Sequence, residues 1–262
     1  MTRFAFGKNW RQFLDTLTEP QILEAGNALK SMLSVESLAG KTLLDIGAGS
    51  GLHSLAARRL GASVASFDFD PQAVECVNSL KARYFPRDPA WTVAQGAALD
   101  ERFLAALGTF DVVYSWGVLH HTGQMWKALD LAAARTKPGG ALFIAIYNAH
   151  WTSPLWKAVK YAYNIAPPRL RALLVRLFSG VKFVGAWLTT GQNPLKSARG
   201  MTFRCDVIDW LGGYPYEYAN IAEIVRAVES RGFRAVKIVP TAGWTGCNQF
   251  IFQRMTHVMQ QI

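Results

Sequence analysis

Between residues 41 and 147, short apolar segments alternate with segments of helical periodicity, and this alternation constrains the fold more than any other feature. Repeated strand–helix units of this kind form a parallel sheet covered by helices. The apolar segments lack regular polar positions, which is typical of strands buried on both faces. Strands are therefore expected at residues 41–46, 63–67, 91–95, 110–115 and 141–147.

The segments on either side extend this core. Residues 1–40 have the pattern of helices that precede the sheet, and residues 221–231 that of a helix ending at Gly232. Two more strands, at 233–239 and 248–253, are joined by a short glycine-containing loop, which predicts an antiparallel pair. The expected fold is α/β and Rossmann-like: a seven-stranded, mostly parallel sheet with an antiparallel last strand, N-terminal helices and a helical insertion after strand five.

The segment LLDIGAGSG joins the first expected strand to a helix through Gly47, Gly49 and Gly51. Glycines at such a turn let backbone N–H groups and the positive end of the helix approach a ligand closely. Asp45 precedes the loop, where a carboxylate would repel a pyrophosphate but attract a cation such as the α-ammonium group of methionine. Asp68 ends the next strand, where a carboxylate can accept both hydroxyls of a ribose.

With LLDIGAGSG, SFDFDP, FDVVYSWGVLHH and KPGGALFIAIYN in this order and spacing, the chain resembles the class I S-adenosylmethionine-dependent methyltransferases. The resemblance covers residues 41–148 and the final strand pair. It implies S-adenosyl-L-methionine as the cofactor. Glycine-rich turns and strand-end acids also occur in Rossmann-type dehydrogenases, so the assignment depends on the four motifs together.

The resemblance also implies where the cofactor binds. The amino-acid end would be held by Asp45, Gly47, Ala48, Gly49 and Gly51. Asp68 would hold the ribose and Phe69 would cover the adenine. The pocket would be completed by residues after strands three and four: Gly96, Ala97, Ser115, Trp116 and Gly117. Many members of the family have an acid near the adenine amino group where this chain has Ala97, so adenine would rely on backbone contacts or on Asp100.

Two adjacent histidines, His120 and His121, follow the fourth strand, at the edge where α/β sheets bind ligands. Methyl transfer from a sulfonium is an in-line displacement, and a hydroxyl acceptor must also lose its proton. An imidazole can take that proton, so both histidines are candidate catalytic bases, with His121 preferred. For either residue the alternative is structural: capping the next helix or bonding a carbonyl.

Candidates for binding the acceptor lie at the end of strand five and in the segment RCDVIDWLGGYPYEY. They are Tyr147, Asn148, Arg204, Trp210, Tyr214 and Tyr216. The segment contains Gly and Pro and could close over the pocket to exclude water, as lids do. Its tyrosines could equally pack an ordered loop.

Residues 131–205 contain no Asp or Glu and carry most of the excess positive charge of a chain whose net charge is +10. Apolar residues recur at helical spacing before and after Pro167 and Pro168, which predicts two helices. Apolar, aromatic and basic positions mixed in this way are typical of membrane-surface helices, whereas the arginines argue against a span. Peripheral membrane contact through residues 151–190 is one interpretation. A helical cap over the acceptor is slightly favoured, and nucleic acid is a less favoured partner.

The whole of residues 1–262 is expected to form a single methyltransferase domain. Its parts are an N-terminal helical cap (1–40), a cofactor-binding core (41–148), a basic helical insertion and lid (149–219), and a C-terminal helix with a strand pair (220–262). Three cysteines without paired or ligand spacing predict neither disulfides nor a metal site. The charged N-terminus does not resemble a signal peptide, which predicts a cytoplasmic protein. No oligomeric state follows from the sequence.

These features predict a methyltransferase that acts on oxygen of a small, hydrophobic or lipid-like acceptor with histidine-assisted deprotonation. In this it is broadly similar to ubiquinone-biosynthesis O-methyltransferases. One alternative is an N- or C-methyltransferase of a secondary metabolite, since a nitrogen acceptor often needs no strong base. Another is a non-catalytic module that binds the cofactor or a membrane, because a fold does not guarantee a function.

Overall fold

A computed structural model describes residues 7–190, 203–242 and 246–256 of the chain. Seven strands form one sheet in the order β3-β2-β1-β4-β5-β7-β6. Strands β1 to β5 are parallel, and β7 runs antiparallel to both β5 and β6. The strands are β1 (Thr42–Ile46), β2 (Ser63–Asp68), β3 (Trp91–Gln95), β4 (Phe110–Trp116), β5 (Thr136–Tyr147), β6 (Phe233–Val239) and β7 (Cys247–Arg254). The predicted fold class is confirmed.

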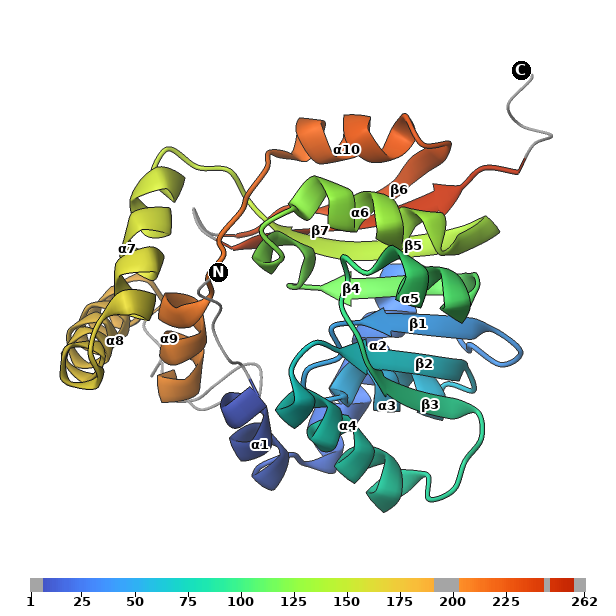
Figure 1. Ribbon diagram of the computed structural model, residues 1–262, viewed down its shortest axis with the longest axis horizontal. Helices are drawn as coiled ribbons and strands as arrows, with labels where there is room; N and C mark the ends of the chain where they lie inside the picture. The colour runs from blue at the N-terminus through green and yellow to red at the C-terminus, as the bar shows by residue number, and fades with distance from the viewer. Residues whose placement is uncertain (1–6, 191–202, 243–245, 257–262) are drawn as a thin grey trace.

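Helices cover both faces of the sheet (Figure 1). One face packs against α1 (Gly7–Asp15), α2 (Glu19–Leu33), α3 (Leu52–Arg59) and α4 (Pro71–Tyr84). The other packs against α5 (Glu101–Leu107), α6 (Met125–Ala134) and α10 (Ile221–Glu229). Because side chains alternate along a strand, Leu43 of β1 joins the first core and Leu44 the second. Both faces are therefore buried, as the continuous apolar strands predicted.

Strand β5 begins earlier than the sequence predicts. The sequence predicts this strand from residue 141, but β5 already starts at Thr136, close after the end of α6 at Ala134. Thr136 pairs with Phe110, and the register then shifts so that Ala141 pairs with Val112. The intervening residues form a bulge, and Lys137 ties it to β4 through an ion pair with Asp111 at 2.9 Å.

Three further helices lie together beside one end of the sheet (Figure 1). They are α7 (Ser153–Ile165), α8 (Pro168–Thr190) and α9 (Phe203–Gly212). Tyr163, Val175, Val207 and Leu211 form a small apolar core between them. None of the helices in the described ranges has both the length and the apolarity needed to cross a bilayer.

Candidate active site

The glycine loop after β1 has the close approaches that its sequence predicts. Gly47 and Gly49 have φ values of +74° and +56°, a region that side chains other than glycine rarely adopt. A Cβ on Gly47 would lie 2.5 Å from the Val118 side chain, so no larger residue fits there. The N–H groups of Gly47 and Ala48 both donate to the carbonyl of Phe67, at 2.9 and 3.0 Å. The loop is thereby fixed to the end of β2.

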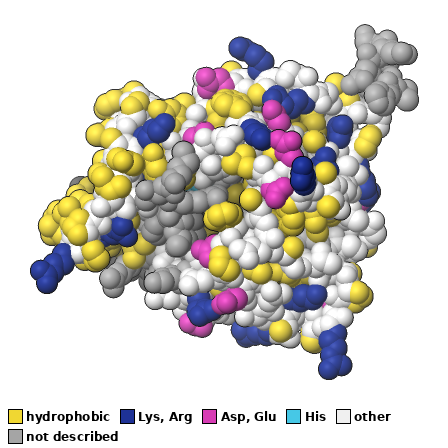
Figure 2. Space-filling model, viewed as in Figure 1, with side chains coloured by type: hydrophobic (Ala, Val, Ile, Leu, Met, Phe, Trp, Pro, Cys, Tyr) yellow, Lys and Arg dark blue, Asp and Glu magenta, His cyan; other side chains and the backbone are white. Residues whose placement is uncertain are grey.

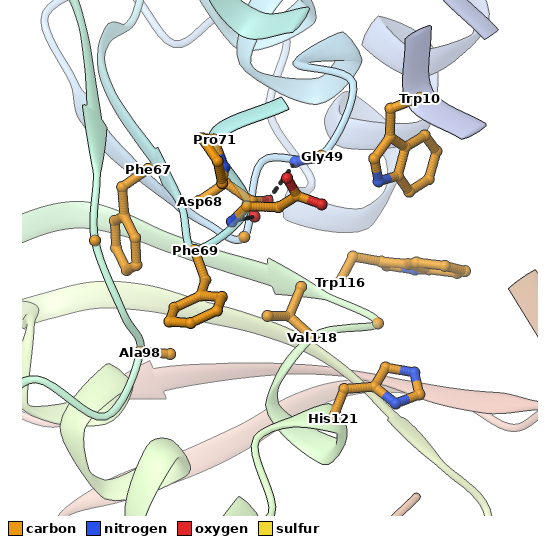
Figure 3. A pocket seen from close by; sticks show the side chains of 14 residues that line it. Trp10, Gly49, Phe67, Asp68, Phe69, Pro71, Ala98, Trp116, Val118 and His121 are labelled. Atoms are coloured by element: carbon orange, nitrogen blue, oxygen red, sulfur yellow. Dashed lines mark hydrogen bonds between the residues drawn. The ribbon is translucent and has the colours of Figure 1, made fainter. Parts of the chain in front are cut away.

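Asp68, at the end of β2, holds the glycine loop from the other side (Figure 3). Its Oδ2 accepts a hydrogen bond from the Gly49 N–H at 2.9 Å, and its Oδ1 accepts one from the Asp70 N–H, also at 2.9 Å. A carboxylate oxygen can accept more than one bond, so these contacts are compatible with the predicted ribose contacts. Asp68 therefore also organises the pocket itself.

Asp45 is buried beneath the same loop, with 2% of its surface exposed. Burial raises the pKa of its carboxyl group to about 7, and the nearby Asp68 carboxylate adds to that rise, while a hydrogen bond from Ser54 opposes it. Ser54 Oγ lies 2.5 Å from Asp45 Oδ2 and 2.7 Å from Ser66 Oγ. A cation bound nearby would favour the ionised form of Asp45.

A pocket of about 340 Å³ opens between the glycine loop and the ends of β2, β3 and β4 (Figure 3). Eight residues predicted for the site line it: Gly47, Gly49, Asp68, Phe69, Gly96, Trp116, Gly117 and His121. Six others were not assigned from the sequence: Trp10, Phe67, Asp70, Pro71, Ala98 and Val118. Phe67, Asp70 and Pro71 lie inside the motif SFDFDP, and Val118 lies inside FDVVYSWGVLHH. Assigning every residue of these motifs to the site would have found four of the six, and Ala98 directly follows the predicted Ala97.

Trp10 comes from α1, far from the motifs in sequence. Its indole packs on the glycine loop, because a Cβ on Gly49 would lie 3.0 Å from the ring. The Gly7 N–H donates to Asp70 Oδ2 at 2.9 Å, and Arg11 pairs with Glu75 of α4. The N-terminal helix therefore covers the pocket. The sequence predicts a helical cap over residues 1–40, but no local pattern in it indicates that Trp10 lines the cofactor pocket.

A second cavity of about 360 Å³ adjoins the first beneath α1 and α2. Both are lined by Trp10, Gly47, Gly49 and Trp116. Asp45, Ala48, His53, Tyr114 and Gln249 lie only in the second. Burial lowers the pKa of His53 to about 4, so its imidazole is neutral. The predicted cofactor residues are thus divided between two connected spaces.

Three residues predicted for the cofactor site have structural positions outside these cavities. Ser115 is fully buried and donates to the carbonyl of Ile46. Gly51 is the N-cap of α3, with a φ of +82°. The Ala97 carbonyl accepts from the N–H of Asp100, whose side chain caps α5 by accepting from Phe103. Asp100 is therefore engaged as a helix cap.

Five of the residues predicted to act on or bind the acceptor form one aromatic cluster: His120, His121, Tyr147, Trp210 and Tyr216. Ring centroids of His120 and Tyr147 are 4.0 Å apart, and those of Tyr147 and Tyr216 are 4.9 Å apart. Trp210 of α9 packs edge-on against Tyr147 at 5.7 Å. The cluster joins the end of β4, the end of β5 and the helices of the insertion.

The two histidines differ in their surroundings. His121 Nδ1 lies 2.6 Å from the carbonyl of Pro215, and because a carbonyl only accepts, Nδ1 carries the proton in the neutral ring. His121 Nε2 then has the lone pair. His120 is completely buried, its Nδ1 accepts from the Tyr147 N–H, and its Nε2 has no partner. Burial, together with His121 and Lys160, holds the pKa of His120 well below its usual value.

Lys160 of α7 is a further member of this cluster that the sequence did not single out. Its side chain is fully buried, and its ammonium group donates to the Trp210 carbonyl. Nζ lies 4.2 Å from the centroid of the Trp210 ring and 5.0 Å from that of Tyr216. Burial lowers the pKa of Lys160 to about 7. Its helical spacing alone gave no reason to place this lysine inward.

The remaining acceptor candidates lie elsewhere. Asn148 Oδ1 accepts from Asn248 at 3.0 Å and so fixes the end of β5 to β7. Tyr214 packs against Tyr161 of α7 with the two rings tilted by 55° and their centroids 5.4 Å apart. The side chain of Arg204 lies outside the described part of the structure. In the described ranges, no three His, Cys, Asp or Glu side chains are grouped to hold a metal ion.

Comparison with known proteins places this site in a family. The methyltransferase domain family matches residues 20–196, which include the glycine loop, Asp68 and both histidines. The chain belongs to this family. The predicted class I S-adenosylmethionine-dependent methyltransferase is thereby confirmed, and with it S-adenosyl-L-methionine as the cofactor.

Relatives of known name share the core at modest identity. A ubiquinone biosynthesis O-methyltransferase of a Methylobacterium species is 34% identical over 76% of this chain and 62% of its own length. A tRNA U34 carboxymethyltransferase of Methylococcus capsulatus is 37% identical over 42% of this chain, but only 33% of that enzyme is covered. The chain thus spans between a third and two thirds of these relatives.

Solved structures agree in fold. Magnesium protoporphyrin IX methyltransferase from Synechocystis, crystallised with S-adenosylhomocysteine, superposes with a TM-score of 0.57 at 14% identity. The match covers 94% of this chain and 93% of that enzyme. At this level of sequence identity the comparison shows a shared fold and carries no statement about the substrate.

Proposed function

We propose that this methyltransferase transfers the methyl group to an oxygen of a small, hydrophobic or lipid-like acceptor, and that His121 removes the acceptor's proton. One observation carries the assignment of the base. Of the two predicted bases, His121 is the one that lines the cofactor pocket, and the Pro215 carbonyl fixes its proton on Nδ1. The lone pair of Nε2 is then the basic position.

S-Adenosylmethionine supplies an electrophilic methyl group on its sulfonium. Asp68 and the glycine loop would hold the adenosine and amino-acid parts of the cofactor, and α1 with Trp10 would shield them from water. His121 Nε2 would take the proton that the acceptor oxygen gives up when that oxygen is methylated, and the demethylated thioether would be the second product. Because binding fixes both reactants, much of the rate enhancement would come from orientation.

His120 has a different part in this proposal. Its ring is packed between His121 and Tyr147, with centroid distances of 4.5 and 4.0 Å, and its lowered pKa keeps it neutral. It would position His121 and stay without charge itself. The aromatic character of this cluster, with Tyr147, Trp210 and Tyr216, suits an apolar acceptor.

The named relatives support an oxygen acceptor of lipid-like character, since several are ubiquinone biosynthesis O-methyltransferases. A lipid-like acceptor would be met at a membrane surface, so the proposal includes peripheral contact through residues 151–190. The tRNA-modifying relative matches a smaller part of the chain and offers the competing substrate class.

The test is methyl transfer from labelled S-adenosylmethionine to a panel of hydrophobic phenols and catechols, with the wild type and His121→Gln. The variant is expected to lose ~10²–10⁴-fold in kcat and to regain part of it at high pH, where the acceptor ionises by itself. Calorimetric binding of the cofactor should be unchanged. His150→Gln, at the start of the insertion, is the matched control and should retain full activity.

Two outcomes would contradict the proposal. If His121→Gln methylates as well as the wild type, the base assignment is wrong, and a nitrogen or carbon acceptor should be tested next. If the wild type binds the cofactor but methylates neither phenols, amines nor tRNA, the chain is a binding module that retains the fold without turnover.

A further inference from the structure

Exposed apolar side chains gather on the two helices that follow β5. Eight of the strongly exposed large apolar residues belong to α7, α8 or the turn before α7: Trp151, Leu155, Tyr161, Ile165, Leu170, Leu173, Leu177 and Val181. Their exposure reaches 81% at Trp151 and 69% at Val181. Single exposed apolar residues are ordinary, but a gathering of this size marks an interaction site.

On α8 these residues form a continuous stripe. Leu170, Leu173, Leu177 and Val181 follow at intervals of three or four residues, which places them on one side of a helix. The opposite side contains Val175, which is buried against α7 and α9. The helix therefore has two apolar sides, and only one of them is used in packing among the described residues.

The cations around this stripe have no acidic neighbours in sequence. Residues 131–205 lack Asp and Glu, and Lys157, Arg169 and Arg176 are exposed on the same helices. In space, Lys157 lies near enough to Glu217 for their charges to interact. Figure 2 shows apolar side chains over the end of the molecule where α7 and α8 lie, with Lys and Arg at its margin. We name the eight apolar residues and these three cations the α7–α8 face.

The α7–α8 face is directly linked to the aromatic cluster of the active site. Lys160 projects inward from α7 to the Trp210 carbonyl, and Trp156 of α7 packs edge-on against the Trp210 ring at 5.6 Å. Trp210 in turn contacts Tyr147. The same two-helix unit thus presents one side to the acceptor cluster and the other to the surroundings.

We propose that the α7–α8 face docks on the surface of a bilayer that contains anionic phospholipid, with its apolar residues in the boundary between headgroups and acyl chains and its cations on the headgroups. Helices that combine an apolar stripe with Lys and Arg bind membranes in this way. This inference rests on the proposed function and deepens it: it names the surface, the residues and the lipid charge of the membrane contact proposed there for delivery of a lipid-like acceptor. Binding to lipid can be measured without any methyl transfer.

The combination of residues favours a bilayer over two other partners. A nucleic acid would be bound by the cations and would gain little from an exposed leucine stripe. A protein partner would have to offer an apolar groove for the α8 stripe together with acidic groups for the cations. An anionic bilayer satisfies the stripe and the cations together, with each cation near the surface increasing binding about fivefold.

The test is co-sedimentation of the full chain with vesicles of phosphatidylcholine alone and of phosphatidylcholine mixed with phosphatidylglycerol. The wild type should bind the mixed vesicles more tightly, and added salt should weaken binding. Leu173→Glu with Leu177→Glu should abolish binding to both. Arg169→Gln with Arg176→Gln should weaken binding to mixed vesicles by about 25-fold while leaving the weak binding to phosphatidylcholine unchanged.

Val236→Glu is the matched control, because Val236 is 56% exposed on β6, outside the face, and its variant should bind as the wild type does. Calorimetric titration with S-adenosylmethionine shows that each variant is folded and separates this inference from the proposed function. The inference is overturned if the wild type binds neither kind of vesicle, or if the glutamate variant binds as well as the wild type. Binding to RNA that depends on the two arginines but not on the two leucines would assign the face to nucleic acid. A dimer that dissociates in the Leu177→Glu variant would assign the face to self-association.

Discussion

Replacing Asp45 by Asn should make the protein more stable at neutral and alkaline pH while weakening its affinity for the cofactor. Asp45 is buried, and burial raises the pKa of its carboxyl group from 3.8 to about 7. Such a displacement corresponds to about 4 kcal/mol of free energy. Asn is nearly isosteric and can still accept the hydrogen bond from Ser54, but it never ionises.

The direction of the pH dependence follows from linkage. Because the pKa of Asp45 is higher in the folded state than in the unfolded state, the folded state binds the proton more tightly. The free energy of unfolding should therefore fall by about 1.4 kcal/mol for each pH unit between 3.8 and 7, and the full loss remains above 7. Asp45→Asn lacks this contribution, so the free energy of unfolding of the variant relative to that of the wild type should increase as the pH rises.

Whereas folding favours the protonated form of Asp45, cofactor binding should favour the ionised form. The ammonium and sulfonium groups of S-adenosylmethionine favour an ionised Asp45, so binding to the wild type below about pH 7 should release a proton. Calorimetry in buffers of different ionisation enthalpy measures that proton, and urea denaturation at several pH values measures stability. Asp130→Asn, which removes an exposed carboxyl group that lines neither cavity, is the control and should change neither result.

Two results would refute this reasoning. One is a difference in unfolding free energy between Asp45→Asn and the wild type that does not change with pH. The other is cofactor binding to the wild type without proton release. Either would mean that Asp45 is ionised in the folded protein before the cofactor arrives, and that the surrounding residues already compensate its charge.

Two further predictions concern other carboxylate and ammonium groups of the site. Asp68→Ala should weaken S-adenosylmethionine binding about 100-fold, because the ribose hydroxyls and the Gly49 N–H lose the carboxylate that accepts their hydrogen bonds. Calorimetry measures the affinity, and Asp130→Ala on the surface is the control. An affinity equal to that of the wild type would contradict the prediction. Lys160→Met should raise the free energy of unfolding at neutral pH by about 1–4 kcal/mol. Because the pKa of Lys160 is about 7 in the folded state and 10.5 in the unfolded state, the free energy of unfolding of the wild type should rise between these two pH values. Urea denaturation at several pH values measures this rise, which Lys160→Met should lack. The same rise in the variant would show that the buried Lys160 does not cause it.

The sequence by itself determined the order of strands and helices and the cofactor motifs. Alternating periodicity identifies buried strands because side-chain direction repeats over two residues, and glycines mark a turn because only they adopt positive φ freely. Both effects are local, so Gly47, Gly49 and Asp68 could be assigned before the structure was known. The start of β5 was wrong because a bulge depends on the pairing of Phe110 with Thr136, which is not a local property.

Only the tertiary structure decided what surrounds the histidines and what covers the pocket. His121 is oriented by Pro215, 94 residues away in sequence, and Asp68 and the glycine loop are covered by Trp10 of α1. A lysine at position 160 is polar in any sequence pattern, yet it is buried because α9 presents a carbonyl and an indole ring to it. Contacts between distant segments depend on how whole helices pack, and that packing is set by the summed burial of many residues rather than by any single motif.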